Sequence, residues 1–149
     1  IDGNAGDDII FGDDGADVIL GNTGNDTLEG NRGSDTVNGD VGDDLIIWRN
    51  GDGTDTVNGG ADTDTQQLFM STGAIGDEST LTASGTDAVF ARTNLIPFSV
   101  TMTAVEEVEF NGLEGDDTLE VGDLAVAGAV GLVLRRQGVE LVVDLVDVA

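Results

Sequence analysis

The first half of the chain is built on a nine-residue repeat, and this period constrains its fold more than any other feature. Five copies follow one another without a break over residues 3–47, Trp48 and Arg49 then interrupt the phase, and two weaker copies run over residues 50–67. A period of nine is out of phase with a helix of 3.6 residues per turn. Residues 1–65 also hold 14 of the 23 glycines, which would destabilise a helix severely. The repeat therefore excludes helix.

Each position of the repeat has a physical role that its residue type explains. Position 1 is Gly and position 2 is Asn or Asp in the first five copies, and position 4 is Gly in six copies, so the loop tolerates the left-handed backbone of a tight turn. Position 8 is aliphatic in six of the seven copies, which predicts a short strand over positions 7 to 9 with one side chain facing inward. Position 6 is Asp in all seven copies, namely Asp8, Asp17, Asp26, Asp35, Asp44, Asp55 and Asp64.

An acid at fixed pitch on a glycine-rich loop predicts a cation site shared between neighbouring loops. Calcium takes six to eight oxygen ligands from carboxylates and carbonyls, more than one loop supplies. If two nonapeptides close one coil, loops n and n+2 stack on the same edge, and a calcium ion between them receives oxygens from both. The pairs predicted in this way are Asp8 with Asp26, Asp26 with Asp44, Asp17 with Asp35 and, after the insertion, Asp35 with Asp55 and Asp44 with Asp64.

The nonapeptides match the pattern GGxGxDxUx, and the stretch resembles the RTX (repeats-in-toxin) calcium-binding β-roll of secreted bacterial proteins. The resemblance covers residues 3–65 and one isolated copy at 112–120. It implies a right-handed parallel β-roll that forms on calcium binding, with the metal held between turns by the position-6 aspartates. In the seventh copy Asp62 replaces the position-4 glycine and Gln66 replaces the aliphatic residue, and both changes depart from the family pattern.

The charge of the chain supports a cation ligand and excludes several functions. There are 30 acidic residues against five arginines, a net charge of −25, so nucleic acid and anionic membranes are poor partners. Residues 1–65 carry 15 Asp and one Glu against two Arg, a net charge of −14, which about five calcium ions would bring close to neutrality. We therefore expect folding and calcium binding to be one event.

A catalytic role is not expected. The sequence has no His, Cys, Tyr or Lys, so no histidine-activated serine or cysteine nucleophile can form, and only carboxylate pairs could act as acid and base. No run approaches the ~20 apolar residues of a spanning helix. We therefore expect neither enzyme activity nor membrane insertion. The fold class that the repeats and the strand patterns predict is all-β.

The sequence divides into a repeat domain, residues 1–67, and a second, β-rich segment, residues 68–149. Alternating patterns predict strands near residues 79–83, 88–92, 99–109 and 132–146, with turns between them, but the pattern leaves their register open. The isolated copy at 112–120 places Asp117 at position 6 without an adjacent nonapeptide. For Asp117, a surface turn and a calcium site both remain open.

Six apolar residues stand at the outward positions 7 and 9, where the other copies have polar residues. The favoured interpretation is that the second half of the chain covers them, and the alternative is a contact with another copy. The six residues are Ile9, Phe11, Val18, Leu20, Leu45 and Ile47.

The function expected is a calcium-binding structural module of a secreted or cell-surface bacterial protein, as part of an extracellular fibre or adhesin. Because Ile1 and Asp2 occupy positions 8 and 9 of an incomplete repeat, we expect either further repeats in a parent chain or head-to-tail self-association. One alternative is a secretion and folding tag of an exported enzyme or toxin. Another is an ice-binding or glycan-binding roll, with Thr27, Thr36, Thr56, Thr63 and Thr65 as candidate contacts.

Overall fold

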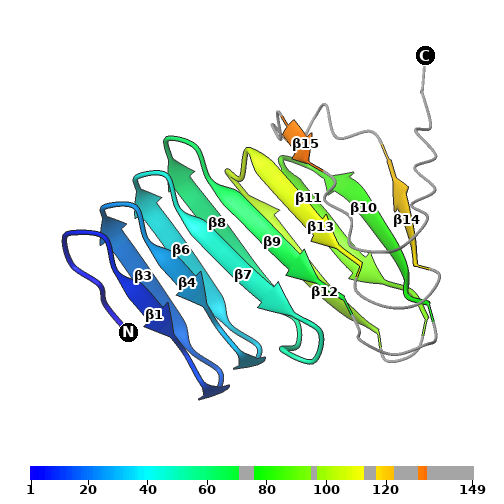
Figure 1. Ribbon diagram of the computed structural model, residues 1–149, viewed down its shortest axis with the longest axis horizontal. Helices are drawn as coiled ribbons and strands as arrows, with labels where there is room; N and C mark the ends of the chain where they lie inside the picture. Colours follow the sequence, from blue (N-terminus) through cyan, green and yellow to red (C-terminus); the bar gives the residue numbers. More distant parts are fainter. Residues whose placement is uncertain (71–75, 95–96, 113–116, 123–130, 134–149) are drawn as a thin grey trace.

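The computed structural model of the chain is all-β, and its strands form two large sheets that face each other (Figure 1). The structure describes residues 1–70, 76–94, 97–112, 117–122 and 131–133. Within these residues, no helix is long and apolar enough to cross a membrane. The all-β fold class predicted from the repeat is confirmed.

Sheet 1 is entirely parallel, because every strand runs in the same direction as its neighbours. Its strands are, in spatial order, β1 (Ile9–Phe11), β4 (Thr27–Glu29), β7 (Leu45–Arg49), β9 (Thr65–Phe69), β13 (Glu107–Asn111) and β15 (Gly131–Val133).

Sheet 2 is mostly parallel, but β11 runs antiparallel to both of its neighbours. Its strands are, in spatial order, β14 (Thr118–Val121), β10 (Glu78–Ser84), β11 (Asp87–Arg92), β12 (Phe98–Thr103), β8 (Asp55–Ala61), β6 (Thr36–Val41) and β3 (Val18–Thr23). Two short strands, β2 (Asp14–Gly15) and β5 (Arg32–Gly33), pair separately.

The strand register confirms that two nonapeptides make one coil. In sheet 1, Ile10 lies opposite Leu28, which is 18 residues further on, and Leu28 lies opposite Ile46. In sheet 2, Val37 lies opposite Val57, a spacing of 20 residues that absorbs the two-residue insertion. Loops n and n+2 therefore stack, as the repeat predicts.

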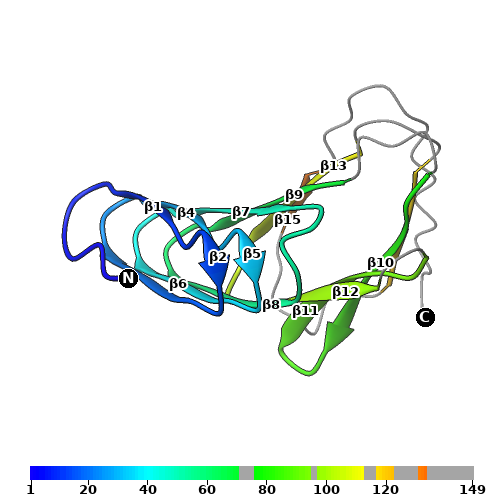
Figure 2. The same cartoon turned by 90° about the horizontal axis from the view of Figure 1, so that it is seen from below.

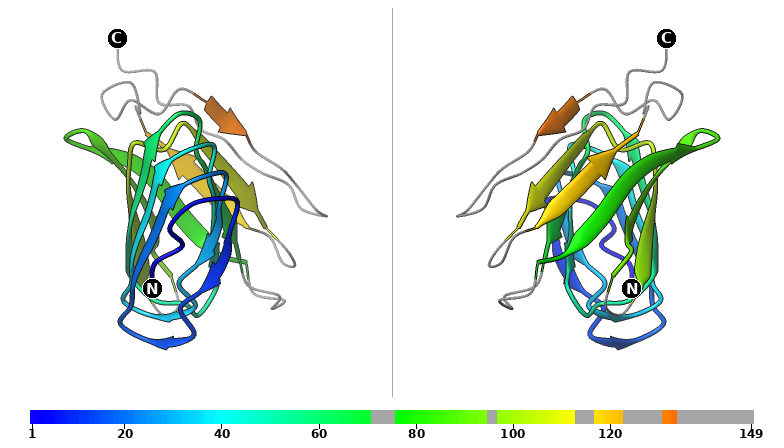
Figure 3. Two further views of the ribbon diagram at one scale, coloured as in Figure 1. Left: turned by 90° about the vertical axis from the view of Figure 1, so that its left-hand side faces the viewer. Right: turned by 90° about the vertical axis from the view of Figure 1, so that its right-hand side faces the viewer.

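The loops gather along two edges of the stack, as the end views show (Figure 3). We call them the first edge, with loops 3–8, 21–26, 39–44 and 59–64, and the second edge, with loops 12–17, 30–35 and 50–55. Each edge carries one position-6 aspartate per coil. The two edges are the upper and lower margins of the roll in Figure 1.

The interior of the repeats is a single column of side chains from each sheet. The position-8 residues fill it and are buried, since strand side chains alternate between faces. They are Ile10, Ile19, Leu28, Val37, Ile46 and Val57.

Beyond the insertion the two sheets move apart (Figure 2). Aromatic rings fill the wider core. The Trp48 ring stacks on Phe98 with centroids 4.1 Å apart, and Phe90 contacts Phe110 at 6.0 Å. Trp48 is 2% exposed, and its indole Nε1–H donates to the Gly53 carbonyl at 3.2 Å. The insertion therefore begins this aromatic core.

The second half extends both sheets beyond residue 67. β9 pairs with β13 in sheet 1, and β8 pairs with β12 in sheet 2. The expected strand over residues 99–109 is two strands, because Ala104 adopts a left-handed φ of 47° and turns the chain from sheet 2 to sheet 1. Of the expected strand at 132–146, residues 134–146 lie outside the described residues.

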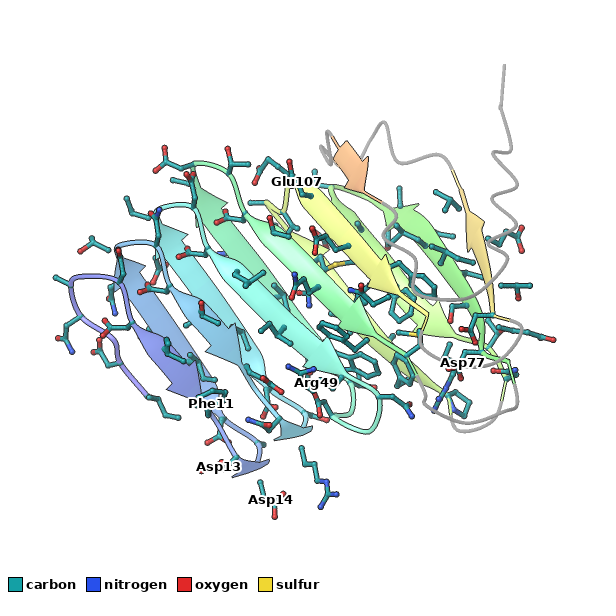
Figure 4. The ribbon with its side chains drawn as sticks, viewed as in Figure 1. Phe11, Asp13, Asp14, Arg49, Asp77 and Glu107 are labelled. Carbon is teal, nitrogen blue, oxygen red and sulfur yellow. The ribbon has the colours of Figure 1, made fainter. Side chains whose placement is uncertain are left out.

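The prediction that the second half covers the outward apolar residues is wrong for three of them. Ile9, Phe11 and Val18 are 71%, 53% and 56% exposed. They belong to β1 and β3, whereas the second half adds its strands at the opposite end of each sheet. Phe11 accordingly lies at the free margin of sheet 1 (Figure 4).

Gln66 places a polar amide in the interior column between Ile46 and Val108. The side chain is 0% exposed, and its Oε1 has no hydrogen-bond partner in the described part of the chain. A buried polar atom without a partner costs about 1–3 kcal/mol. We expect Gln66→Leu to raise the free energy of unfolding by about 1–3 kcal/mol, measured by urea denaturation in saturating calcium.

The neighbouring Gln67 provides the control for this substitution. Its Nε2 donates to Glu109 Oε2 at 2.6 Å on the outer side of sheet 1, so Gln67→Leu removes a hydrogen bond and should not stabilise the chain. If Gln66→Leu destabilises as much as Gln67→Leu, the interior placement of Gln66 is wrong.

Candidate metal sites

The loops turn tightly because their second residue adopts the left-handed conformation. The φ angles of Asn4, Asp13, Asn22, Asn31 and Asp40 lie between 62° and 75°. Asn and Asp tolerate this region better than other non-glycine residues. Position 2 therefore does not need the glycine of the family pattern.

The position-6 aspartates form one ladder along each edge. On the first edge, the Asp8 N–H donates to Asp26 Oδ1 at 2.8 Å, Asp26 N–H to Asp44 Oδ1 at 2.8 Å, and Asp44 N–H to Asp64 Oδ1 at 2.9 Å. On the second edge, the Asp17 N–H donates to Asp35 Oδ1 and the Asp35 N–H to Asp55 Oδ1, both at 2.9 Å. All five predicted pairs are thus neighbours.

The second oxygen of most of these carboxylates is buried and has no hydrogen-bond partner among the residues that the structure describes. This holds for Oδ2 of six aspartates, namely Asp8, Asp17, Asp26, Asp35, Asp44 and Asp64. An ionised carboxylate oxygen that has lost its water and gained no partner is strongly unfavourable. Each Oδ2 therefore requires a proton or a cation.

The position-1 glycines leave space for such a ligand. A Cβ atom on Gly3 would lie 2.8 Å from the Gly21 carbonyl oxygen, one coil on, and 3.1 Å from Asp8 Oδ2. A Cβ on Gly12 would meet the Gly30 carbonyl oxygen and Asp17 Oδ2 in the same way. One carboxylate oxygen and one carbonyl oxygen therefore converge beside each of these glycines.

This donor set fits calcium, which prefers hard oxygen ligands and accepts irregular geometry. Among the described residues, no three acidic side chains are placed to share one ion. A calcium ion here would draw its ligands from the aspartate Oδ2 atoms, loop carbonyls and water. Calcium would supply the positive charge that offsets the stacked carboxylates.

Asp117 does have a stacking neighbour, which the repeat pattern did not reveal. The Asp77 N–H donates to Asp117 Oδ1 at 2.8 Å, and the Thr118 N–H donates to the Asp77 carbonyl at 2.8 Å. Asp77 also pairs with the Arg92 guanidinium at 3.2 Å. This pair lies beyond the second-edge ladder, where Figure 4 marks Asp77.

Two of the other loop acids, Asp7 and Asp43, help to build a second ladder on the first edge. Asp7 Oδ1 accepts the Asn25 N–H at 2.8 Å, Asn25 Oδ1 accepts the Asp43 N–H at 3.1 Å, and Asp43 Oδ1 accepts the Thr63 N–H at 2.9 Å. Asp13 and Asp14 are exposed on the second edge, as Figure 4 shows.

Burial raises the pKa of several ladder aspartates. It raises the pKa of both Asp55 and Asp64 to about 6, from an ordinary value of 3.8. This is a net rise: the N–H groups of Asp35 and Asp44, respectively, hydrogen-bond to these two carboxylates and lower their pKa, while the carboxylates of the same two residues raise it. Burial also raises the pKa of Asp35 and Asp44. The ladders therefore resist holding full negative charge without a cation.

These shifts predict how the calcium-free chain responds to pH. A carboxyl with a raised folded-state pKa contributes stability that is complete below its ordinary pKa and lost as the pH rises through the folded-state pKa. The melting temperature of the calcium-free protein should therefore fall as the pH rises from about 4 to about 7, and the increase produced by calcium should grow over the same range. If calcium raises the melting temperature by the same amount at about pH 4 and at about pH 7, this prediction is wrong.

A stack of parallel coils with one acid per loop defines a β-roll. The family model for the RTX calcium-binding nonapeptide repeat matches residues 1–19, 11–46 and 51–66 in four copies, which is less than half of the chain. This part of the chain therefore consists of RTX repeats, a class of repeat that binds calcium. A comparison with curated proteins found no match.

Proposed function

We propose that the chain is a calcium-stabilised structural module, in which the position-6 aspartates bind about five calcium ions between stacked loops. The observation that carries the proposal is the row of buried Oδ2 atoms without partners on both edges. Each ion would lie between one carboxylate and the carbonyls of the next coil. This arrangement offsets the −14 charge of residues 1–65 while joining neighbouring coils.

The experiment is a count of bound calcium in the full chain by equilibrium dialysis, with magnesium as the competing ion. About five ions should bind at millimolar free calcium, and magnesium should not displace them because it prefers a smaller octahedral site.

Two matched variants test how the aspartates of one ladder depend on one another. Asp26→Ala removes an Oδ2 ligand and also the acceptor of the Asp8 N–H. Asp8→Ala removes only an Oδ2 ligand, because Asp8 is the first aspartate of the ladder in the described residues. Asp26→Ala should therefore cost more stability than Asp8→Ala, and equal losses would count against the stacking of loop n on loop n+2.

The narrower proposal is an extracellular fibre or adhesin of a bacterial surface. Secreted RTX proteins meet millimolar calcium outside the cell, which suits weak sites. The exposed Ile9, Phe11 and Val18, together with the open edge of β1, support a contact at this end of the roll. Light scattering across a calcium titration tests the contact. A monomer at high calcium and high protein concentration would exclude self-association.

A glycan-binding or ice-binding face is a second candidate, and one observation favours it. Thr36, Thr56 and Thr101 lie opposite one another on three adjacent strands of sheet 2, and Asn38, Asn58 and Thr103 form a parallel row. Of the other candidate contacts, Thr27 and Thr65 are separated by Leu45 on sheet 1, and Thr63 lies on a loop. Binding to insoluble neutral polysaccharide that Thr56→Val abolishes would support this candidate, and unchanged binding would exclude the face.

A further inference from the structure

The turn between β12 and β13 stacks on the last repeat loop, although it is not a repeat. The turn has three residues, Ala104–Glu106, where the repeat loop 59–64 has six. Thr103 lies opposite Asn58 before the turn, and Glu107 lies opposite Thr65 after it. The short turn therefore spans the same gap between sheets on the first edge. Figure 4 marks Glu107, the residue after the turn, on this edge.

The backbone contacts place Glu106 at the position of a ladder aspartate. The Asp64 N–H donates to Glu106 Oε2 at 2.9 Å, just as the Asp44 N–H donates to Asp64 Oδ1 at 2.9 Å. The N–H groups of Glu106 and Glu107 donate to the Asp64 carbonyl at 3.2 and 2.9 Å. The longer glutamate side chain compensates for the shorter turn, so the acidic ladder continues beyond the repeats.

Asp64 itself has an unsatisfied atom at this junction. The residue is 0% exposed, and no described residue makes a hydrogen bond to its Oδ2. The ion pairs of Arg49 with Glu29 and of Arg92 with Asp77 lie at the ends of β7 and β11. The charge of Asp64 is therefore not offset by either of these ion pairs.

The carbonyl of Ala104 completes the same arrangement that the repeats show. A Cβ on Gly59 would lie 2.6 Å from Asp64 Oδ2 and would clash with the Ala104 carbonyl oxygen. One coil earlier, a Cβ on Gly39 would meet Asp44 Oδ2 and the Gly59 carbonyl oxygen. The left-handed φ of Ala104, 47°, accompanies this placement. Ala104 therefore stands where the repeats have a position-1 glycine.

We propose that Asp64 Oδ2, the Ala104 carbonyl and the Glu106 carboxylate form an additional cation site of the calcium type, which joins the last repeat to the strands that follow. The site rests on the proposed function, because it uses the same oxygen chemistry as the repeats. It adds one ion to the five, and that ion binds residues outside the repeats. Calcium binding is thereby coupled to the docking of β12 and β13 on the roll.

The test is the number of calcium ions bound by the full chain and by Glu106→Gln, with Glu107→Gln as the control. Glutamine keeps an oxygen that can accept the Asp64 N–H, so the fold should survive, and far-UV circular dichroism in saturating calcium checks this. Glu106→Gln should bind one ion fewer than the wild type or hold it at least about tenfold more weakly. Glu107→Gln should bind the same number, because Glu107 lies on the strand beyond the turn.

A second variant separates this site from the sites of the repeats. Asp64→Asn should lose the same ion, and the double variant should lose no more than Asp64→Asn alone. If Asp64→Asn loses an ion and Glu106→Gln loses none, the additional site is overturned while calcium binding by the repeats stands. If the wild-type chain binds no calcium, the proposed function fails as a whole.

Discussion

Replacement of Arg92 by methionine is expected to lower the free energy of unfolding by about 3–5 kcal/mol, because it leaves a buried carboxylate without its cation. Arg92 is 8% exposed, and its Nη1 donates to Asn50 Oδ1 at 2.7 Å and to Asp77 Oδ1 at 3.2 Å. Its guanidinium also lies 4.7 Å from the centre of the Phe98 ring. Asp77 is 0% exposed, so its charge cannot return to water without unfolding. Urea denaturation in saturating calcium measures the loss.

Two controls accompany the Arg92 variant. Arg32→Met removes an exposed arginine and should change stability by no more than about 0.5 kcal/mol. Adding Asp77→Asn to Arg92→Met removes the unpaired charge and should recover a large part of the loss. A double variant no more stable than Arg92→Met alone would show that the packing of Arg92, and not its charge, stabilises the chain.

Substitution of Gly39 by alanine is expected to remove one calcium ion and to destabilise the roll by about 1–3 kcal/mol. The new Cβ would lie 2.5 Å from the Gly59 carbonyl oxygen and would also meet Asp44 Oδ2, two atoms that we assign to one calcium site. Gly39 does not adopt a left-handed φ, so the cost comes from the filled space and not from backbone strain. Calcium content by equilibrium dialysis and urea denaturation measure the two effects.

Gly122→Ala is the matched control for Gly39→Ala. A Cβ on Gly122 would meet only ordinary contacts, the nearest being a Thr82 methyl carbon at 3.4 Å. Neither stability nor calcium content should change. If Gly39→Ala binds as many ions as the wild type, the converging oxygens beside the position-1 glycines are not calcium ligands.

The repeats could be interpreted from sequence because their information is local and periodic. A nine-residue period with Asp at position 6 and an aliphatic residue at position 8 determines which side chains face inward. The stacking of loop n on loop n+2 follows, since two nonapeptides are needed to visit both sheets. Asp26 and Leu28, at positions 6 and 8 of the third copy, accordingly lie where the pattern predicts.

The sites beyond the repeats could not be predicted in the same way, because they depend on contacts between distant segments. Asp77 meets Asp117 across 40 residues, and Asp64 meets Glu106 across 42. One local signal was present. Glu106 stands two residues before the buried Val108, as each ladder aspartate stands two residues before its inward residue. The pattern search did not find this signal, because the segment before Glu106 lacks the position-1 and position-4 glycines of the repeat.

The role of the insertion also depended on the tertiary fold. In the sequence, Trp48 interrupts the repeat phase, but in the structure it is the first side chain of the aromatic core. Its indole ring needs partners from β11 and β12, which the sequence pattern does not bring together. The same core explains why the sheets separate at this point.

The central claim is that the unpartnered aspartate oxygens hold calcium and that the roll depends on it. The most direct measurement is the far-UV circular dichroism spectrum and melting temperature of the full chain at neutral pH, first after exhaustive removal of calcium and then during calcium titration. The β-sheet signal and the melting temperature should both be low without calcium and rise together as it is restored, and magnesium should not replace it. A calcium-free chain with the same spectrum and the same melting temperature as the calcium-loaded chain would contradict the account.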